Sequence, residues 1–325
     1  MFNIQKMRIT IIGPGIMQIP PKGWGAVESL IWDYKLFLEK VQGVHVTIVN
    51  TPHPSDIIQL TNQSVPDVVH IQYDNLWQLW DKFDCKNVML TSHYGYLDQL
   101  DKRQGDGYKS IFNGFINECQ AKIVSLSPSI RNMYLKYGCP ENRVMVVPNG
   151  ANHEVFHYQE EALYKDRSIY LAKIDYRKRQ YIYQDIEFID FVGNIADGGF
   201  NPNRLNYKGE WSKDTLYQHL SDYTNLVLLS DGEAHPLVCC EALVCGLGLV
   251  VSEFAAANLD TSLPWIDVIP TNKLDDISYV RSVIRENQFK SIVYRSEIRE
   301  YGLKYFSWSV AVKKYLVCIK TFFGL

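Results

Sequence analysis

Residues 231–243 read Asp231-Gly232-Glu233-Ala234-His235-Pro236-Leu237-Val238-Cys239-Cys240-Glu241-Ala242-Leu243, and they place two carboxylates eight residues apart around the start of an apolar helix. An apolar strand is expected before this stretch, at 225–230, and another after it, at 247–252, so the three elements form one βαβ unit. Pro236 suits the first helical turn, where its missing N–H has no partner to lose, and Gly246 suits the helix exit. Ligands of such sheets bind beyond the carboxyl ends of the strands, where Glu233 would lie.

The second glutamate, Glu241, lies among apolar residues, and a carboxylate in that setting needs hydrogen-bond donors. The hydroxyls of a sugar or a ribose would provide them. Each glutamate alone has a plainer interpretation, Glu233 as a solvated turn residue and Glu241 as a carboxylate favoured by the helix dipole. The pair therefore becomes informative only if matching motifs occur elsewhere in the chain.

Length and composition indicate an ordinary two-domain globular protein. A chain of 325 residues exceeds what one core usually holds, and 46% of its residues are hydrophobic and 21% charged. The net charge of −3 does not favour nucleic acid as a partner. Because no run of about 18 apolar residues and no signal peptide is present, we expect a soluble, cytoplasmic protein with at most peripheral membrane contact. The seven cysteines form no Cys-x-x-Cys pair, so they read as reduced core residues, with neither zinc nor a disulfide framework.

Apolar strands alternate with helical patterns in both halves of the chain, which predicts an α/β protein with two parallel sheets covered on both faces. In the first half, a strand closed by Gly13-Pro14-Gly15 leads through a loop to a helix over 30–38. Pro148-Asn149-Gly150 interrupts the pattern, and the polar stretch 151–167 is expected to be a connection. The predicted strands cover residues 8–12, 44–49, 68–71, 87–91, 122–126 and 143–147 in the first half, and 168–171, 188–193, 225–230, 247–252 and 265–269 in the second.

Further motifs accompany the two glutamates in a consistent order along the chain. They are the glycine-rich loop Lys22-Gly23-Trp24-Gly25-Ala26-Val27-Glu28, the segment Leu90-Thr91-Ser92-His93-Tyr94-Gly95, the junction 144–156, the strand and loop Tyr170-Leu171-Ala172-Lys173-Ile174-Asp175-Tyr176-Arg177-Lys178, and Asn206-Tyr207-Lys208-Gly209-Glu210. Together with Glu233 and Glu241 they resemble the retaining glycosyltransferases of the GT-B fold, in particular glycosyltransferase family 4. The resemblance spans nearly the whole chain.

The resemblance implies a fold of two Rossmann-like domains facing each other across a cleft. It implies an acceptor-side domain over 1–152 and a nucleotide-sugar-binding domain over 153–306. The segment 307–325 would form a helix that crosses back to pack on the first domain, although such an apolar-periodic tail is also compatible with a membrane-binding amphipathic helix.

The function implied is transfer of a hexose from a UDP- or GDP-sugar to a hydroxyl of a glycan, lipid-linked or small-molecule acceptor, in glycan or glycoconjugate synthesis. On this resemblance Glu241 binds the donor ribose, Glu233 lies near the donor sugar, and Lys173 and Lys178 hold the diphosphate. His93 and the loop from Gly23 through Trp24 to Gly25 would complete the catalytic site from the first domain. Donor contacts are further implied for the segment around the nucleotide base and for the start of the helix, namely Tyr207, Pro236, Leu237 and Val238. No metal or other cofactor is implied.

The chain departs from the family pattern at two places. Ala172-Lys173 replaces the usual Gly-Arg, so bidentate recognition by a guanidinium is lost there, and Arg177 or Arg179 is a candidate to share the role. Residues 253–260 replace a common Gly-Gly turn. The resemblance therefore does not assign the residues that would line the sugar end of the donor pocket. The segment 74–101, with two tryptophans, matches no family motif and is a candidate to shape the acceptor site.

Two other classes of enzyme lack residues that they require, and two further functions remain as alternatives. A dinucleotide-dependent dehydrogenase would need a third glycine where Gln18 stands and an acidic ribose ligand where Asn50 stands. A metal-dependent transferase of the other common architecture would need an Asp-x-Asp site, which the chain lacks. A catalytically degenerate GT-B protein that binds a nucleotide sugar as a partner subunit stays open, as does a sugar-nucleotide epimerase of similar fold.

Overall fold

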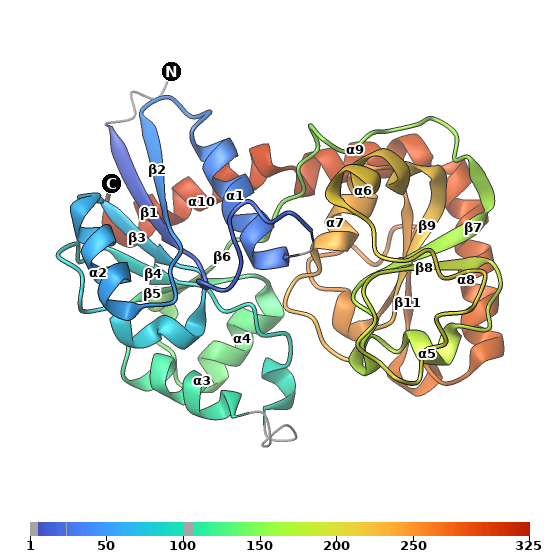
Figure 1. Cartoon of the computed structure of the whole chain (residues 1–325), viewed down its shortest axis with the longest axis horizontal. Coiled ribbons are helices and arrows are strands. Elements are labelled where there is room, and N and C mark those ends of the chain that lie inside the picture. Colours follow the sequence, from blue (N-terminus) through green and yellow to red (C-terminus); the bar gives the residue numbers. More distant parts are fainter. Residues whose placement is uncertain (1–5, 24, 101–106) are drawn as a thin grey trace. The chain divides into compact units, whose positions relative to one another are not determined.

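The computed structural model describes residues 6–23, 25–100 and 107–325. Contacts between Cα atoms divide the chain into two compact units. The first unit holds residues up to Asn149 together with Ala311–Leu325, and the second holds Gly150–Val310. Each unit is built around one parallel sheet (Figure 1).

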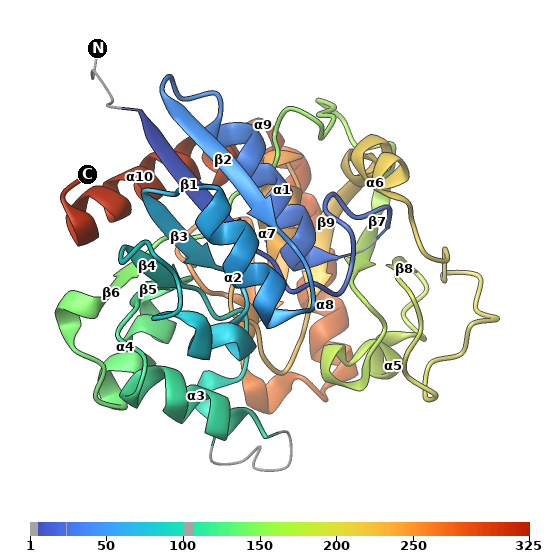
Figure 2. The same ribbon diagram turned by 60° about the vertical axis from the view of Figure 1, so that its left-hand side comes forward.

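The sheet of the first unit has the strand order β2-β1-β3-β4-β5-β6. Each strand runs parallel to its neighbours, so every connection is a crossover, and most crossovers contain a helix. The C-terminal helix α10 also lies against this sheet in two views (Figures 1 and 2), where Tyr315 bonds to His70 of β3. The elements are β1 (Met7–Ile12), α1 (Ala26–Leu38), β2 (Val44–Val49), α2 (Pro54–Gln63), β3 (Val68–Ile71), β4 (Val88–Leu90), α3 (Tyr108–Asn117), β5 (Lys122–Ser125), α4 (Pro128–Lys136), β6 (Val144–Val146) and α10 (Trp308–Phe323).

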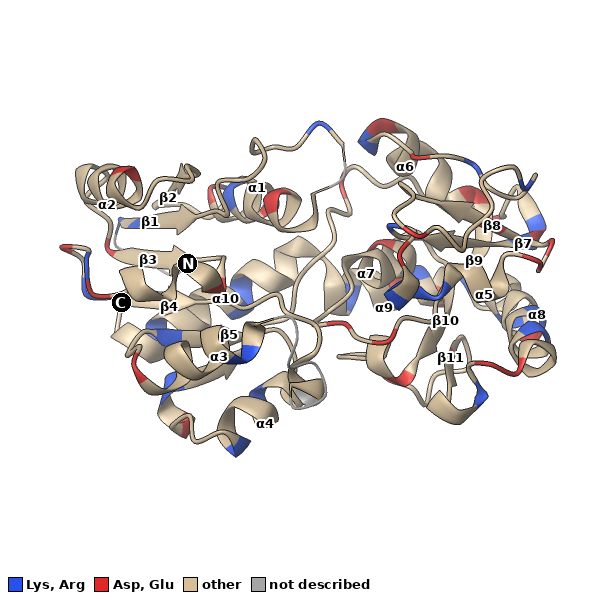
Figure 3. Ribbon diagram, turned by 60° about the horizontal axis from the view of Figure 1, so that its bottom comes forward, with Lys and Arg blue, Asp and Glu red and all other residues tan. Residues whose placement is uncertain are grey.

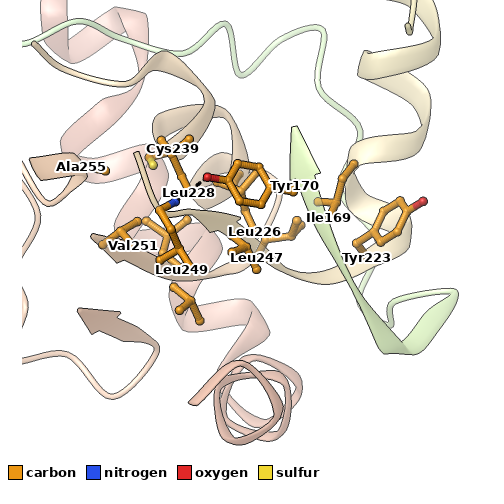
Figure 4. Packing of buried hydrophobic residues seen from close by; sticks show 14 of the residues in the cluster. Ile169, Tyr170, Tyr223, Leu226, Leu228, Cys239, Leu247, Leu249, Val251 and Ala255 are labelled. Atoms are coloured by element: carbon orange, nitrogen blue, oxygen red, sulfur yellow. Dashed lines mark hydrogen bonds between the residues drawn. The ribbon is translucent and has the colours of Figure 1, made fainter. Parts of the chain in front are cut away.

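The sheet of the second unit has the order β11-β10-β9-β7-β8, again with parallel neighbours. β9 and β10 are buried along their whole length, as expected for strands covered on both faces. Figure 4 shows Tyr170 of β7 among buried residues of β9 and β10, including Leu226 and Val251. The elements are β7 (Tyr164–Leu171), α5 (Gln180–Tyr183), β8 (Ile189–Val192), α6 (Lys213–His219), β9 (Tyr223–Leu228), α7 (Leu237–Val244), β10 (Gly248–Ser252), β11 (Ile266–Ile269), α8 (Ile277–Val293) and α9 (Arg295–Phe306).

The strands predicted from apolar runs are all present, with ends that differ by a few residues. The prediction that 151–167 is only a connection is wrong at its end, because β7 begins at Tyr164, where that residue pairs with Tyr223 of β9. Pro236 is the residue before the first helical turn of α7 and not inside it. Gly246 follows α7 with φ of +80°, which is the left-handed conformation expected at a helix exit.

Two further expectations concern membrane-spanning helices and cysteine chemistry. No helix in the described ranges combines the length and the apolarity that a membrane span requires. All seven cysteines are free, and six are buried, whereas Cys85 is half-buried and not a core residue.

Candidate active site

The strand order of the second unit places a switch point between β7 and β9. From β7 the chain goes to β8 on one side, and it then returns to β9 on the other side. The loops that leave the carboxyl ends of two such strands diverge, and ligands of open α/β sheets bind in the space that this creates. Residues 172–179 follow β7, and residues 229–236 follow β9. The sequence predicts that the first loop carries Lys173 and Lys178, which would hold a diphosphate, and that the second loop carries Glu233.

An ion pair joins the two loops. Lys178 Nζ donates to Glu233 Oε1, with side chains that are 23% and 13% exposed. The two residues are 55 positions apart in sequence, and their pairing follows from the adjacency of β7 and β9. A cation and an anion are therefore held together at the switch point, partly shielded from water, where charge interactions are stronger than at the surface.

Backbone hydrogen bonds fasten the same loops. The Asp231 amide donates to the carbonyl of Arg177 at 2.9 Å, and Arg179 forms an ion pair with Asp231 at 3.1 Å. The hydroxyl of Tyr170, which is fully buried in β7, accepts from the Leu229 amide at 2.8 Å and donates to the carbonyl of Lys178. Lys178 is thus supported through its own main chain.

The second glutamate has a different environment. Glu241 lies in α7 and is half-buried, and among the described residues its carboxylate makes no hydrogen bond or ion pair. Burial raises the pKa of Glu241, and the opposing effect of Lys213 is smaller. A half-buried carboxylate without donors is a costly arrangement that a ligand with hydroxyl groups would relieve.

The next donor-side candidates, Lys173 and Arg177, lie in the loop after β7 that also carries Lys178. Lys173 is half-buried, and its carbonyl accepts from Gln180 Nε2 at 2.9 Å. Arg177, one candidate to replace the missing guanidinium, pairs with Asp175 at 2.8 Å. The hydrogen bond from Arg177 is the main reason why the pKa of Asp175 is lowered, and Lys173 adds a smaller effect. Both candidate arginines, 177 and 179, are therefore already engaged by carboxylates.

The last donor-side candidates lie at the start of α7 and in the segment around Tyr207. α7 begins at Leu237 without a side-chain cap, so the N–H groups of Leu237 and Val238 have no partner within the helix, whereas that of Cys239 donates to the carbonyl of Pro236. Pro236 is buried, whereas Leu237 and Val238 are half-buried. The Tyr207 hydroxyl donates to the carbonyl of Gly193 at 3.1 Å.

In the first unit, His93 follows β4 and is half-buried. Its Nε2 lies 2.9 Å from Oε1 of Gln72, which follows the neighbouring strand β3. Burial lowers the pKa of His93 to about 4, so the imidazole is neutral at pH 7.

The glycine-rich loop is described in part, because Trp24 lies outside the described residues. Gly25 is buried and directly precedes α1, with φ of +149°, a conformation that favours glycine. A Cβ atom at this position would also lie 3.2 Å from Glu28 Oε2. Gly23 is half-buried.

Sequence reasoning missed Tyr170, Asp231 and Gln72. Tyr170 stands inside a strand and gives no local signal. Gln72 is a polar residue directly after the apolar strand 68–71, and the polar segment 91–93 follows the next strand in the same way. This shared position at the strand ends could have identified Gln72. In the described ranges no three His, Cys, Asp or Glu side chains come together in a group that could hold a metal ion.

Comparison with known proteins agrees with this architecture. Residues 30–155 match the family model Glycosyltransferase Family 4. No curated protein sequence matches the chain.

Solved structures match over nearly the whole chain. Sucrose-phosphate synthase from Thermosynechococcus elongatus is 14% identical with a TM-score of 0.77, and the match covers 98% of this chain and 99% of that one. HepE from Anabaena in complex with UDP-glucose is 12% identical with a TM-score of 0.72, covering 97% and 100%. A glycosyltransferase from Rickettsia africae is 14% identical with a TM-score of 0.66, covering 98% and 99%. At such identities the likeness shows the fold. The chain thus has the GT-B fold, and its resemblance to glycosyltransferase family 4 is confirmed by the family model over residues 30–155.

Proposed function

We propose that the protein is a retaining glycosyltransferase that transfers a hexose from a nucleoside diphosphate sugar to a hydroxyl acceptor. The observation that carries the proposal is the arrangement after β7 and β9. There a lysine–glutamate pair closes two loops at the switch point, and a half-buried glutamate on the next helix lacks donors among the described residues. A nucleoside diphosphate sugar supplies a diphosphate for the cation and a ribose diol for the carboxylate.

We assign Glu241 to the two ribose hydroxyls, which can donate to both carboxylate oxygens. Lys178, with Lys173, is assigned to the diphosphate, and the uncapped start of α7 adds partial positive charge. Without a ligand, the charge of Lys178 is balanced by Glu233. A bound diphosphate would compete for the lysine and release Glu233 toward the hexose. Tyr207, Pro236, Leu237 and Val238 are assigned to the donor as well.

The reaction proposed needs no separate base. The bond between C1 of the hexose and the diphosphate oxygen breaks, and the departing oxygen takes the proton of the acceptor hydroxyl. That hydroxyl oxygen then bonds to C1 on the face that the diphosphate leaves, so the anomeric configuration is retained. Lys178 and Lys173 stabilise the negative charge that grows on the diphosphate. For the first unit we assign His93 and the loop Gly23–Gly25 to the same reaction.

UDP-glucose is the first donor to test, because HepE is described in complex with it. The other possibilities, a GDP-sugar donor and a glycan, lipid-linked or small-molecule acceptor, define the rest of the screen. A ligand that binds only the folded state raises the melting temperature by mass action. We expect UDP and UDP-glucose to raise the melting temperature of the wild type and of Lys165→Ala. The rise should be much smaller for Lys178→Ala.

Lys165 is the matched control because it lies in the same unit, carries the same charge and pairs with Glu161 at the surface. If no nucleoside diphosphate or derived sugar shifts the wild type, the proposal fails. Binding without transfer to any acceptor would instead favour a nucleotide-sugar-binding partner subunit. Conversion of the nucleotide sugar into its epimer, without an acceptor, would favour an epimerase. NMR of the product distinguishes retention from inversion.

A further inference from the structure

A line of buried hydrogen bonds runs through the first unit from His93 to the C-terminal helix. Gln72 Oε1 lies 2.9 Å from His93 Nε2, and Gln72 Nε2 lies 3.2 Å from His70 Nδ1. His70 Nδ1 is also 2.9 Å from the Tyr315 hydroxyl, and His70 Nε2 is 2.8 Å from Thr91 Oγ1. Gln72, His70, Thr91 and Tyr315 are each at most 1% exposed, so water does not compete for the bonds that these four residues make with one another.

Strand register explains why these side chains meet. β3 and β4 are neighbours, with Ile71 opposite Leu90, so Gln72 and Thr91 follow at the same level. His70 and Gln72 are two residues apart in extended chain and project to the same face of the sheet. Tyr315 of α10 reaches His70 on that face, where its ring is 4.8 Å from the ring of Tyr34 in α1.

The amide of Gln72 couples the two histidines. It donates through Nε2 to His70 Nδ1, which leaves the His70 proton on Nε2, facing the Thr91 hydroxyl. Its oxygen then faces His93, and an oxygen can only accept, so the His93 proton is on Nε2. Burial keeps both rings neutral at pH 7, because it lowers the pKa of His70 to about 3 and that of His93 to about 4. A neutral imidazole with a proton on Nε2 has a lone pair on Nδ1.

We propose that Gln72 is a positioning residue, which holds His93 in the Nε2-protonated tautomer so that Nδ1 accepts a hydrogen bond from a hydroxyl of the donor hexose or of the acceptor. Within the described part of the chain, Nδ1 of His93 has no hydrogen-bond partner, and the side chain is half-buried and thus still accessible. The role for a sugar hydroxyl rests on the proposed function. The assignment of the tautomer does not, because it follows from the hydrogen bonds of the free protein.

The tautomer can be measured without substrate, by long-range proton–nitrogen correlation of the ¹⁵N-histidine-labelled protein. The chain has eight histidines, and the His93 signals are those that disappear in His93→Ala. We expect the Nε2-protonated pattern for His93 in the wild type and a mixture of tautomers in Gln72→Leu. An Nδ1-protonated His93 in the wild type would overturn the proposal, even if Gln72→Leu failed to fold.

The matched control is Tyr315→Phe, which removes a hydroxyl from the same network but leaves the bond between Gln72 and His93. Its His93 pattern should stay as in the wild type. If Tyr315→Phe changed that pattern and Gln72→Leu did not, the role would not belong to Gln72.

Kinetics then separate positioning from mere structural support. Introduced into the wild-type protein, Gln72→Leu should lower kcat/KM on the order of tenfold. Introduced into His93→Ala it should have little further effect, because Gln72 acts through His93. Equal losses in both backgrounds would mean a structural role and would overturn the proposal. A raised KM for the nucleotide sugar, with unchanged affinity for the bare nucleoside diphosphate, assigns the hydroxyl to the donor hexose. A raised KM for the acceptor alone assigns it to the acceptor. The tautomer of His93 can be measured even in a protein without transferase activity. The proposed function and the proposed role of Gln72 can therefore be refuted independently of each other.

Discussion

The two glutamates after β9 differ in their partners, and this difference predicts different effects of substitution. Glu233 is paired with Lys178, whereas Glu241 makes no hydrogen bond or ion pair with any described residue. Glu241→Gln should therefore weaken the binding of UDP and of the UDP-sugar alike, since both ligands contain the ribose. Glu233→Gln should leave the binding of UDP intact and lower the rate of turnover. A hydrogen bond to a carboxylate contributes about 1.5 to 3 kcal/mol, so changes of roughly tenfold or more are expected in calorimetric titration and rate assays.

The ligand-free protein offers a control for the same residue. Burial raises the pKa of Glu241 above its unfolded value, so the folded state binds more protons than the unfolded state between the two values. Stability is therefore lost as the pH rises through that window, and the loss is complete once the pH exceeds the folded-state pKa. Glu241→Gln should raise the melting temperature of the free protein at pH 7, and the gain should vanish below the unfolded pKa. If both glutamine variants lose UDP equally, the assigned roles are wrong.

At the scale of elements, strand β7 supports both loops through one hydroxyl. Tyr170→Phe would leave the buried Leu229 amide and the Lys178 carbonyl without their partner. We expect a loss of about 1 to 3 kcal/mol in the free energy of unfolding, together with weaker UDP binding because Lys178 is less well held. Tyr223→Phe is the control, since its hydroxyl donates to Asp190 at the opposite end of the sheet. It should reduce stability and leave UDP affinity unchanged. Wild-type UDP affinity in Tyr170→Phe would contradict the supporting role.

For the whole molecule, the charge distribution bears on the need for a metal. Basic and acidic residues are interspersed over each unit (Figure 3), and the carboxylates after β9 are already paired, Asp231 with Arg179 and Glu233 with Lys178. Lysines and a helix start can stabilise a diphosphate in place of a cation. We expect transfer or donor hydrolysis to survive EDTA. Abolition by the chelator, with recovery on addition of Mn²⁺ or Mg²⁺, would refute the metal-independent mechanism.

The sequence by itself determined the elements and their order. Apolar runs of four to six residues mark buried parallel strands, and glycine and proline mark the ends of elements, because these signals depend on near neighbours in the chain. The βαβ unit over 225–252 was therefore predicted with small errors at its ends. The start of β7 was missed because residues 164–166 are exposed and polar or aromatic, and they become a strand only by pairing with β9.

Only the tertiary structure decided which side chains meet. Lys178 pairs with Glu233 because β7 and β9 are neighbours, and Gln72 meets His93 because β3 and β4 are neighbours. Tyr170 and Tyr315 belong to apolar patterns in the sequence, and their hydroxyls find partners 8 to 245 positions away. Strand order is set by the packing of the whole sheet, and hydrogen bonds between loops depend on that order. A local pattern can therefore locate a carboxylate such as Glu241 on its helix, but its isolation from donors emerges only when the surrounding elements are in place.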